Sequence, residues 1–361
     1  MFLISADAPV PQKLPAQREQ SRQRFTNRQE VLQFLRGLKD RSDKRLLIGQ
    51  NLGCGGDCVD GYREYVAALS GIVPGRKTVA LLGIDYCWNV LDPQDVRDCN
   101  RLAVQHWKLG GLVTVSCHVG NPFKTNGDVH DAEFVDLVQL VTPGTPANLL
   151  WTAQLDRIAD GLAELQKAGV VVLWRPFHEM NGGWFWWCPA KYKDRGWTPK
   201  KDFEALWRHM HRHFTQVRGL DNLLWVYSPN AQLDDDVLPT DHYYPGGDVV
   251  DVVGYDLYAN DLNRSTLDAH GSYTRLAAFG KPFGITEFGP LDRDGGFDNR
   301  TLLDGLKRHR PEAAFCLYWS SWTEKPKGVP RLRRQAIIHQ QHPVELLSDP
   351  WSLTREDLAQ P

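Results

Sequence analysis

The stretch that decides the fold runs from Val170 to Cys188 and reads VVVLWRPFHEMNGGWFWWC. Its apolar, β-branched start is typical of a buried strand, and the segment turns polar at Arg175. Two glycines and the four consecutive aromatic residues 184–187 follow. Such a strand delivers its polar end to the rim of a sheet, so Glu179 would stand beside flat rings that can stack on a sugar. The alternative interpretation is a core strand with a satisfied ion pair and an aromatic plug.

Length and composition indicate a large globular protein. The chain has 361 residues, of which 42% are hydrophobic and 24% charged, so we expect a large core rather than global disorder. The formal net charge of −2 gives no electrostatic footprint for a nucleic acid or an anionic membrane, and we expect neither partner. No segment holds 18 consecutive apolar residues, so we expect no membrane-spanning helix.

Hydrophobic periodicity predicts strands that alternate with helices along the chain. The predicted strands cover residues 45–51, 78–88, 111–120, 170–174, 222–230, 248–258, 281–289 and 314–322. Eight strands in this alternation predict one α/β domain, a single (β/α)8 TIM barrel, over residues 27–361. Residues 1–26 are rich in Gln, Arg and Pro without periodicity and are predicted to form a flexible lead-in.

Polar residues at the ends of the predicted strands are the candidates for a site, because barrel active sites form at the C-terminal ends of the strands. Glu179 ends the fourth strand and Glu287 the seventh, on opposite sides of the mouth. Each alone is explained by a rim salt bridge, but two carboxylates flanking a cleft suit glycoside hydrolysis. The other polar strand ends are Asp85, Tyr86, Trp88, His118, Asn121, Arg175, His178, Ser228, Asn230, Asp256, Tyr258, Thr286, Trp319 and Trp322.

The segment RPFHEMNGGWFWW closely resembles the signature of glycoside hydrolase family 26, whose best-known members are endo-β-1,4-mannanases. The similarity continues in CHVGNP at 117–122, GYDLY at 254–258, ITEFG at 285–289 and the closing SDPWSLTREDL, and thus covers roughly residues 30–358. The resemblance implies a (β/α)8 barrel and a retaining mechanism.

By motif position, the resemblance implies that Glu179 is the general acid/base and Glu287 the nucleophile. It implies that His178 and Tyr258 support these carboxylates. The full set of expected substrate-binding residues is His118, His178, Trp184, Asp256, Tyr258, Trp319 and Trp88. An acid that works near neutral pH needs a raised pKa, which burial beside the aromatic run supplies. A phenol donor such as Tyr258 would help to keep the nucleophile ionised.

One departure from the family pattern concerns the substrate. Many family 26 mannanases follow the eighth-strand tryptophan with an arginine that helps to hold sugar hydroxyls, whereas here Trp319 is followed by Ser320, Ser321 and Trp322. We expect cleavage of β-1,4-mannosidic bonds in mannan, glucomannan or galactomannan. The alternatives are a β-1,3-1,4-glucanase, a β-1,3-xylanase, or a barrel that binds glycans without cleaving them.

Motifs for metals and cofactors are weak in this chain, and we expect neither. His178 and Glu179 do not begin a zinc HExxH motif, because residue 182 is Gly. The histidines of HMHRH at 209–213 are predicted to lie on a helix surface, and DRDGG at 292–296 is predicted to be a turn, since it lacks the later Glu of an EF-hand.

The seven cysteines leave the pairing open. Cys54 and Cys58 share a glycine-rich loop and are candidates for a disulfide, whereas those in apolar runs are expected to be buried thiols, namely Cys87, Cys117 and Cys316.

The start of the chain lacks the basic segment and the full apolar run of an intact signal peptide. We nevertheless expect a secreted or periplasmic enzyme that acts as a monomer.

Overall fold

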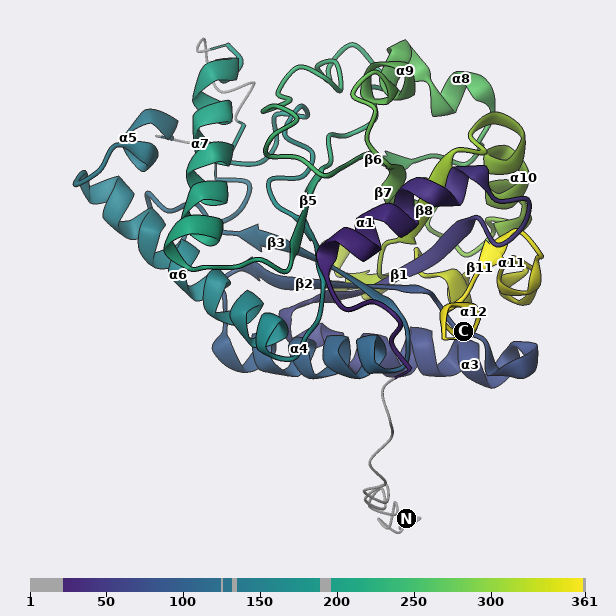
Figure 1. Cartoon of the computed structure of the whole chain (residues 1–361). Coiled ribbons are helices and arrows are strands. Elements are labelled where there is room, and N and C mark those ends of the chain that lie inside the picture. The colour runs from purple at the N-terminus through teal and green to yellow at the C-terminus, as the bar shows by residue number, and fades with distance from the viewer. Residues whose placement is uncertain (1–21, 125, 132–134, 189–195, 360–361) are drawn as a thin grey trace, which may run out of the picture.

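The computed structural model describes residues 22–124, 126–131, 135–188 and 196–359, and its centre is a closed barrel of parallel strands (Figure 1). Each strand pairs with the next along the chain, and the eighth pairs back with the first. The barrel strands are β1 (Leu46–Cys54), β2 (Leu81–Asn89), β3 (Leu112–Val119), β4 (Val172–Arg175), β5 (Leu223–Tyr227), β6 (Val252–Tyr258), β7 (Phe283–Gly289) and β8 (Ala313–Tyr318). This arrangement confirms the predicted (β/α)8 barrel.

Helices cover the outside of the barrel, and side chains cap the start of two of them. Asn27 and Asp92 each accept hydrogen bonds from backbone N–H groups in the first turn of the helix that follows. The helices are α1 (Arg28–Gly37), α2 (Cys58–Gly61), α3 (Ala68–Ile72), α4 (Pro93–Lys108), α5 (Leu137–Val141), α6 (Pro146–Lys167), α7 (Lys200–Arg212), α8 (Arg264–Leu267), α9 (Ser272–Ala277), α10 (Asn299–His309), α11 (Pro343–Ser348) and α12 (Arg355–Leu358). A π-helix, Tyr62–Ala67, joins α2 to α3, and another, His213–Val217, extends α7.

Two connections between barrel strands carry short helices. After β6, α8 and α9 are separate helices, because His270 and Gly271 between them have left-handed backbone, with φ of 49° and 77°. After β3, the connection to β4 contains α5 as well as α6. Neither connection changes the order of the barrel strands.

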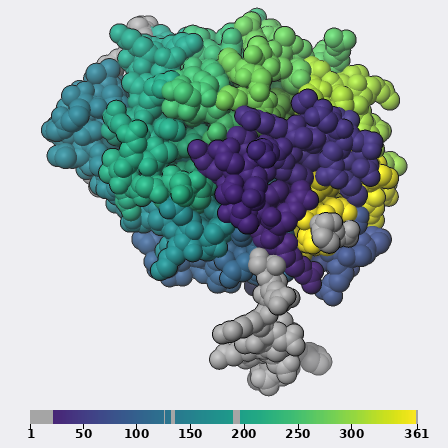
Figure 2. Space-filling model, viewed as in Figure 1, coloured from purple at the N-terminus to yellow at the C-terminus, as the bar shows by residue number. Residues whose placement is uncertain are grey.

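The ends of the described chain close the N-terminal end of the barrel, opposite the mouth. Helix α1 crosses in front of the strands in Figure 1, and Arg28 donates a hydrogen bond to the carbonyl of Leu223 at the start of β5. The short strand β11 (Ser352–Leu353) pairs with the start of β1, so purple and yellow segments adjoin in Figure 2. Of the predicted lead-in, residues 1–21 lie outside the described residues. Residues 22–26 are attached to the barrel, with Arg22 N–H donating to the carbonyl of Lys108.

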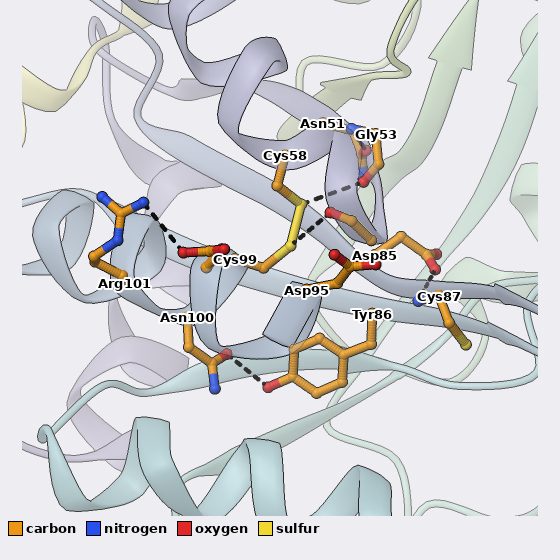
Figure 3. The surroundings of a disulfide bond; sticks show 12 residues. Asn51, Gly53, Cys58, Asp85, Tyr86, Cys87, Asp95, Cys99, Asn100 and Arg101 are labelled. Carbon is orange, nitrogen blue, oxygen red and sulfur yellow. Dashed lines mark hydrogen bonds and ion pairs between the residues drawn. A yellow bond between two sulfur atoms is a disulfide. The ribbon is translucent and has the colours of Figure 1, made fainter. Parts of the chain in front are cut away.

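A disulfide joins two of the covering helices on the β1–β2 side of the barrel. Cys58 at the start of α2 is bonded to Cys99 in α4, with 5.6 Å between their Cα atoms (Figure 3). The candidate pairing of Cys54 with Cys58 is therefore not formed: Cys54 ends β1 and keeps a free thiol. The first turn of α2 directs Cys58 toward α4, a neighbour in space that the sequence spacing does not reveal.

Replacing Cys58 with Ser should lower the free energy of unfolding by about 2–4 kcal/mol, because the bond restrains a long loop in the unfolded chain. Cys54→Ser is the matched control, because it removes a free thiol four residues before Cys58. It should leave stability within about 0.5 kcal/mol of the wild type. Thermal unfolding without reductant measures both. Equal melting temperatures for Cys58→Ser and the wild type would contradict the bond.

Candidate active site

Three acidic side chains converge at the C-terminal mouth of the barrel. One carboxylate oxygen each from Glu179, Asp256 and Glu287 lies within 4.8 Å of the others. Glu179 follows β4, Asp256 lies in β6 and Glu287 in β7. Asp256 is fully buried, whereas both glutamates reach the floor of an open groove of about 900 Å³. The two predicted catalytic glutamates are therefore brought together, as the strand order requires.

A buried arginine from β4 holds two of these carboxylates. Arg175 donates to Asp256 Oδ2 at 2.7 Å and to Glu287 Oε2 at 2.6 Å, and it is 1% exposed. Burial opposes the charge of Arg175, but the two carboxylates outweigh it and raise the pKa of the guanidinium. Asp256 also accepts hydrogen bonds from the hydroxyls of Ser228 and Thr286. This network fixes the direction in which Glu287 points.

Glu179 stands in a different environment. Burial, together with the charges of Asp256 and Glu287, raises the pKa of Glu179 to about 8. The indole N–H of Trp184 donates to Oε2 at 2.7 Å and the amide of Asn230 donates to Oε1 at 3.1 Å; both bonds oppose the rise. Glu179 therefore retains a proton near neutral pH, as a general acid must.

The backbone that presents Glu179 is left-handed at two non-glycine residues. Phe177 has φ of 50° and Glu179 has φ of 55°, a conformation that costs about 1 kcal/mol or more at each residue. The N–H of Glu179 donates to the carbonyl of Ser228 at 2.8 Å, which anchors the turn on the neighbouring strand. Strained backbone held in this way turns the carboxylate toward the groove instead of along the strand.

The four rings of the aromatic run have different surroundings. Trp184 is half-buried against Glu179, whereas Phe185, Trp186 and Trp187 are buried. Gly182 permits this packing, because a Cβ atom there would lie 2.0 Å from the indole ring of Trp184. Phe185 still lines the groove, while Trp186 and Trp187 donate their indole N–H groups to backbone carbonyls behind it.

Tyr258 lies against Glu287. Its hydroxyl donates a short hydrogen bond to Glu287 Oε1, and burial followed by the charge of Glu287 raises the pKa of this phenol well above its ordinary value. Tyr258 therefore stays a donor at any working pH. With Arg175 on Oε2, both oxygens of Glu287 accept a hydrogen bond, which holds the carboxylate in one orientation.

A second series of hydrogen-bonded side chains leads from β2 to the groove. Asp85 Oδ2 lies 2.8 Å from His118 Nδ1, and His118 Nε2 lies 2.9 Å from His178 Nε2. Burial lowers the pKa of His178 well below its ordinary value, so His178 is neutral and shares a hydrogen bond with His118. The expected support of a carboxylate by His178 is not observed among the described contacts, because its Nε2 faces His118 of β3. Its contact orients His118.

The remaining predicted residues separate into groove walls and buried supports. Trp88, 46% exposed, packs against His118 with ring centroids 4.5 Å apart, and the ring of Trp319 lies 5.8 Å from that of His118. Asp256, expected to line the sugar site, lies beneath it instead. Sequence reasoning gave no role to Arg175 or Asn230, although both were visible as polar strand ends.

Replacing Arg175 with Met should cost about 3–5 kcal/mol of stability near neutral pH, because it leaves two buried carboxylates without a cation. Burial and Glu287 already raise the pKa of Asp256 to about 7, against the effect of Arg175. Without Arg175 the pKa of Asp256 should rise further, so the folded variant keeps this proton to a higher pH than the folded wild type does. The stability deficit should therefore grow as pH rises, and be smaller at about pH 5 than at about pH 8.

Urea unfolding at both pH values measures this deficit. Arg208→Met is the control, because its 2.7 Å pair with Asp248 is exposed and should be worth less than about 1 kcal/mol. A deficit for Arg175→Met that is small, or equal at the two pH values, would contradict the buried ion group.

Comparisons with known proteins agree with this geometry. Residues 21–356 match the model of Glycosyl hydrolase family 26. The mannan endo-1,4-beta-mannosidase of Bacillus subtilis strain 168 is 31% identical over 335 residues, covering 91% of this chain and 85% of the relative. The mannan endo-1,4-beta-mannosidase A and B of Caldalkalibacillus mannanilyticus is 32% identical, also over 91% of this chain, which spans only 60% of that relative's length.

A solved structure of a Bacillus subtilis mannanase superposes with a TM-score of 0.75 at 28% identity, covering 93% of this chain and 95% of that one. The match therefore extends over the barrel and its covering helices, not over an isolated motif. The family model spans nearly the whole described chain, including every carboxylate of the mouth. This chain belongs to glycosyl hydrolase family 26.

Proposed function

We propose that the chain is a retaining endo-β-1,4-mannanase in which Glu179 is the general acid/base and Glu287 the nucleophile. One observation carries the proposal: oxygens of the two glutamates lie within 4.8 Å of each other. Retaining glycosidases keep their carboxyl groups about 5–5.5 Å apart, whereas inverting enzymes leave room for a water at about 6.5–9.5 Å. The names of the relatives, mannan endo-1,4-beta-mannosidases, support β-mannan as the substrate.

In the first step Glu287 attacks the anomeric carbon while Glu179 gives its proton to the leaving glycosidic oxygen. The bond to the leaving sugar breaks, and a glycosyl–Glu287 ester forms. The hydrogen bonds of Tyr258 and Arg175 hold Glu287 in the attacking position. In the second step the ionised Glu179 takes a proton from water, which attacks the same carbon and releases Glu287.

The groove walls supply the binding surfaces for this reaction. We place His118, Trp88 and Trp319 against the sugar, and Trp184 at the junction of sugar and acid, because all four lie beside the carboxylates. His178 and Asp256 act through His118 and Arg175.

A secreted or periplasmic location fits the disulfide between Cys58 and Cys99, since such bonds persist in oxidising compartments. No helix in the described part of the chain is long and apolar enough to cross a membrane. A single barrel contains every residue assigned to the reaction, so we propose that the monomer is active.

The function is tested by reducing-sugar release from galactomannan, glucomannan, lichenan and β-1,3-xylan. The wild type should be fastest on the two mannans, and Glu287→Gln should lose at least about 10³-fold in kcat on them. Faster release from lichenan or xylan would contradict the substrate. No release from any of the four would indicate a glycan-binding barrel.

Proton NMR of the first product should show the β-anomer, and initial α-anomer would contradict retention.

Glu179→Ala separates the two catalytic roles. Its rate should fall about 10²–10⁴-fold on mannan, but far less on a dinitrophenyl β-mannobioside, whose leaving group needs no proton. Azide should partly restore the variant by attacking the glycosyl–enzyme and yield a β-mannosyl azide. Asn230→Asp, which alters a neighbour of Glu179 without removing the acid, serves as the control and should show no azide effect. Equal losses on both substrates, without azide rescue, would reverse the assignment.

A further inference from the structure

The turn DRDGG at 292–296, between β7 and α10, carries an arginine whose neighbouring carboxylates are engaged elsewhere. Asp292 Oδ2 accepts from the amide of Asn260 at 2.8 Å, and Asp294 Oδ1 accepts from the N–H of Gly296 at 2.7 Å. Arg293 lies between these two residues, and its buried Nε has no hydrogen-bond partner in the described chain. That atom is buried, so a ligand in the groove would be met by the terminal N–H groups of the guanidinium instead.

Arg293 lines the same groove as Glu287, on the side of the proposed nucleophile. Its guanidinium carbon lies 5.8 Å from the ring centroid of Tyr258 and 5.2 Å from that of Trp322. Since the hydroxyl of Tyr258 contacts Glu287, the Tyr258 ring separates Arg293 from the reacting centre. Arg293 therefore faces the part of the groove next to the reacting sugar.

The backbone holds Arg293 in this position at a cost. Its φ is 55°, in the left-handed region that non-glycine residues avoid, and its carbonyl accepts from the N–H of Arg334 at 3.0 Å. Arg334 directly follows β10 (Arg331–Arg333), which pairs with β9 (Trp322–Glu324), the strand that carries Trp322. The turn and this hairpin thus fix the guanidinium from both sides, which is typical of a functional site.

The chemistry of the groove defines the ligand. A guanidinium face that rests on aromatic rings leaves its in-plane N–H groups free to donate. The far end of the groove is lined by Asp57, Asp60 and Glu64, which would repel a polyanion. The fitting acceptors are therefore neutral hydroxyl oxygens.

We propose that Arg293 is a substrate-binding residue that donates hydrogen bonds to hydroxyls of the glycone sugar adjacent to the reacting one. The inference rests on the proposed mannanase function, because that function defines which sugar is the glycone. It assigns the DRDGG turn a role in choosing the length and identity of the substrate.

The test compares dinitrophenyl β-mannoside, which has one sugar, with dinitrophenyl β-mannobioside, which has two. Arg293→Ala should lower kcat/KM on the mannobioside about 10- to 100-fold and leave the mannoside within about twofold of the wild type. Arg293→Lys should recover little, because an ammonium group lacks the planar fork of donors. Arg331→Ala, on the exposed side of β10, is the control and should match the wild type on both.

Three other results would overturn the inference. An unchanged mannobioside rate in Arg293→Ala would mean that no sugar contact exists. An equal loss on both substrates would show that Arg293 acts through Tyr258 and Glu287. A melting temperature lowered by Arg293→Ala and Arg293→Lys alike, with normal kinetics, would make it a purely structural residue. A wild type that cleaves neither mannobioside nor mannan would instead contradict the proposed function itself.

Discussion

One buried guanidinium governs the chemistry of the mouth. Arg175 leaves the end of β4 and binds a carboxylate from β6 and another from β7, so three strands of the barrel meet in one charged group. A buried charge without partners costs several kcal/mol, and this cost is avoided only in the native register. The hydrogen bond that Arg175 donates to Glu287 also fixes this carboxylate, so the stability of the mouth and the position of the proposed nucleophile depend on one contact.

The two glutamates differ because their neighbours differ. Glu287 accepts from a cation and a phenol, whereas Glu179 accepts from two neutral N–H donors and lies among buried rings. Burial raises the pKa of Glu179 to about 8, while Glu287 is held in place by a cation and a phenol. The left-handed backbone at Glu179 also matters, because it directs the side chain of Glu179 across the groove toward Glu287.

The fold and the two glutamates of the site could be predicted from the sequence. The alternation of strands and helices identifies the barrel, and the ends of the strands place Glu179 and Glu287 at its mouth. The sequence does not reveal contacts that depend on the directions in which side chains point. Cys58 pairs with a helix 41 residues away, and His178 turns to a histidine instead of a carboxylate. Arg293 was invisible as a site, because its turn looked like an ordinary connection and its partners come from other strands.

The closed end of the barrel has a consequence for how this protein can be combined with others. Arg22 is bonded to Lys108, and Ala359 packs against Gly110 in the same loop, so both ends of the described chain emerge together, far from the groove. A carbohydrate-binding module fused at either end would leave the mouth open to a long polymer. For the same reason a short linker can join the two ends, and the barrel is a natural scaffold for circular permutation.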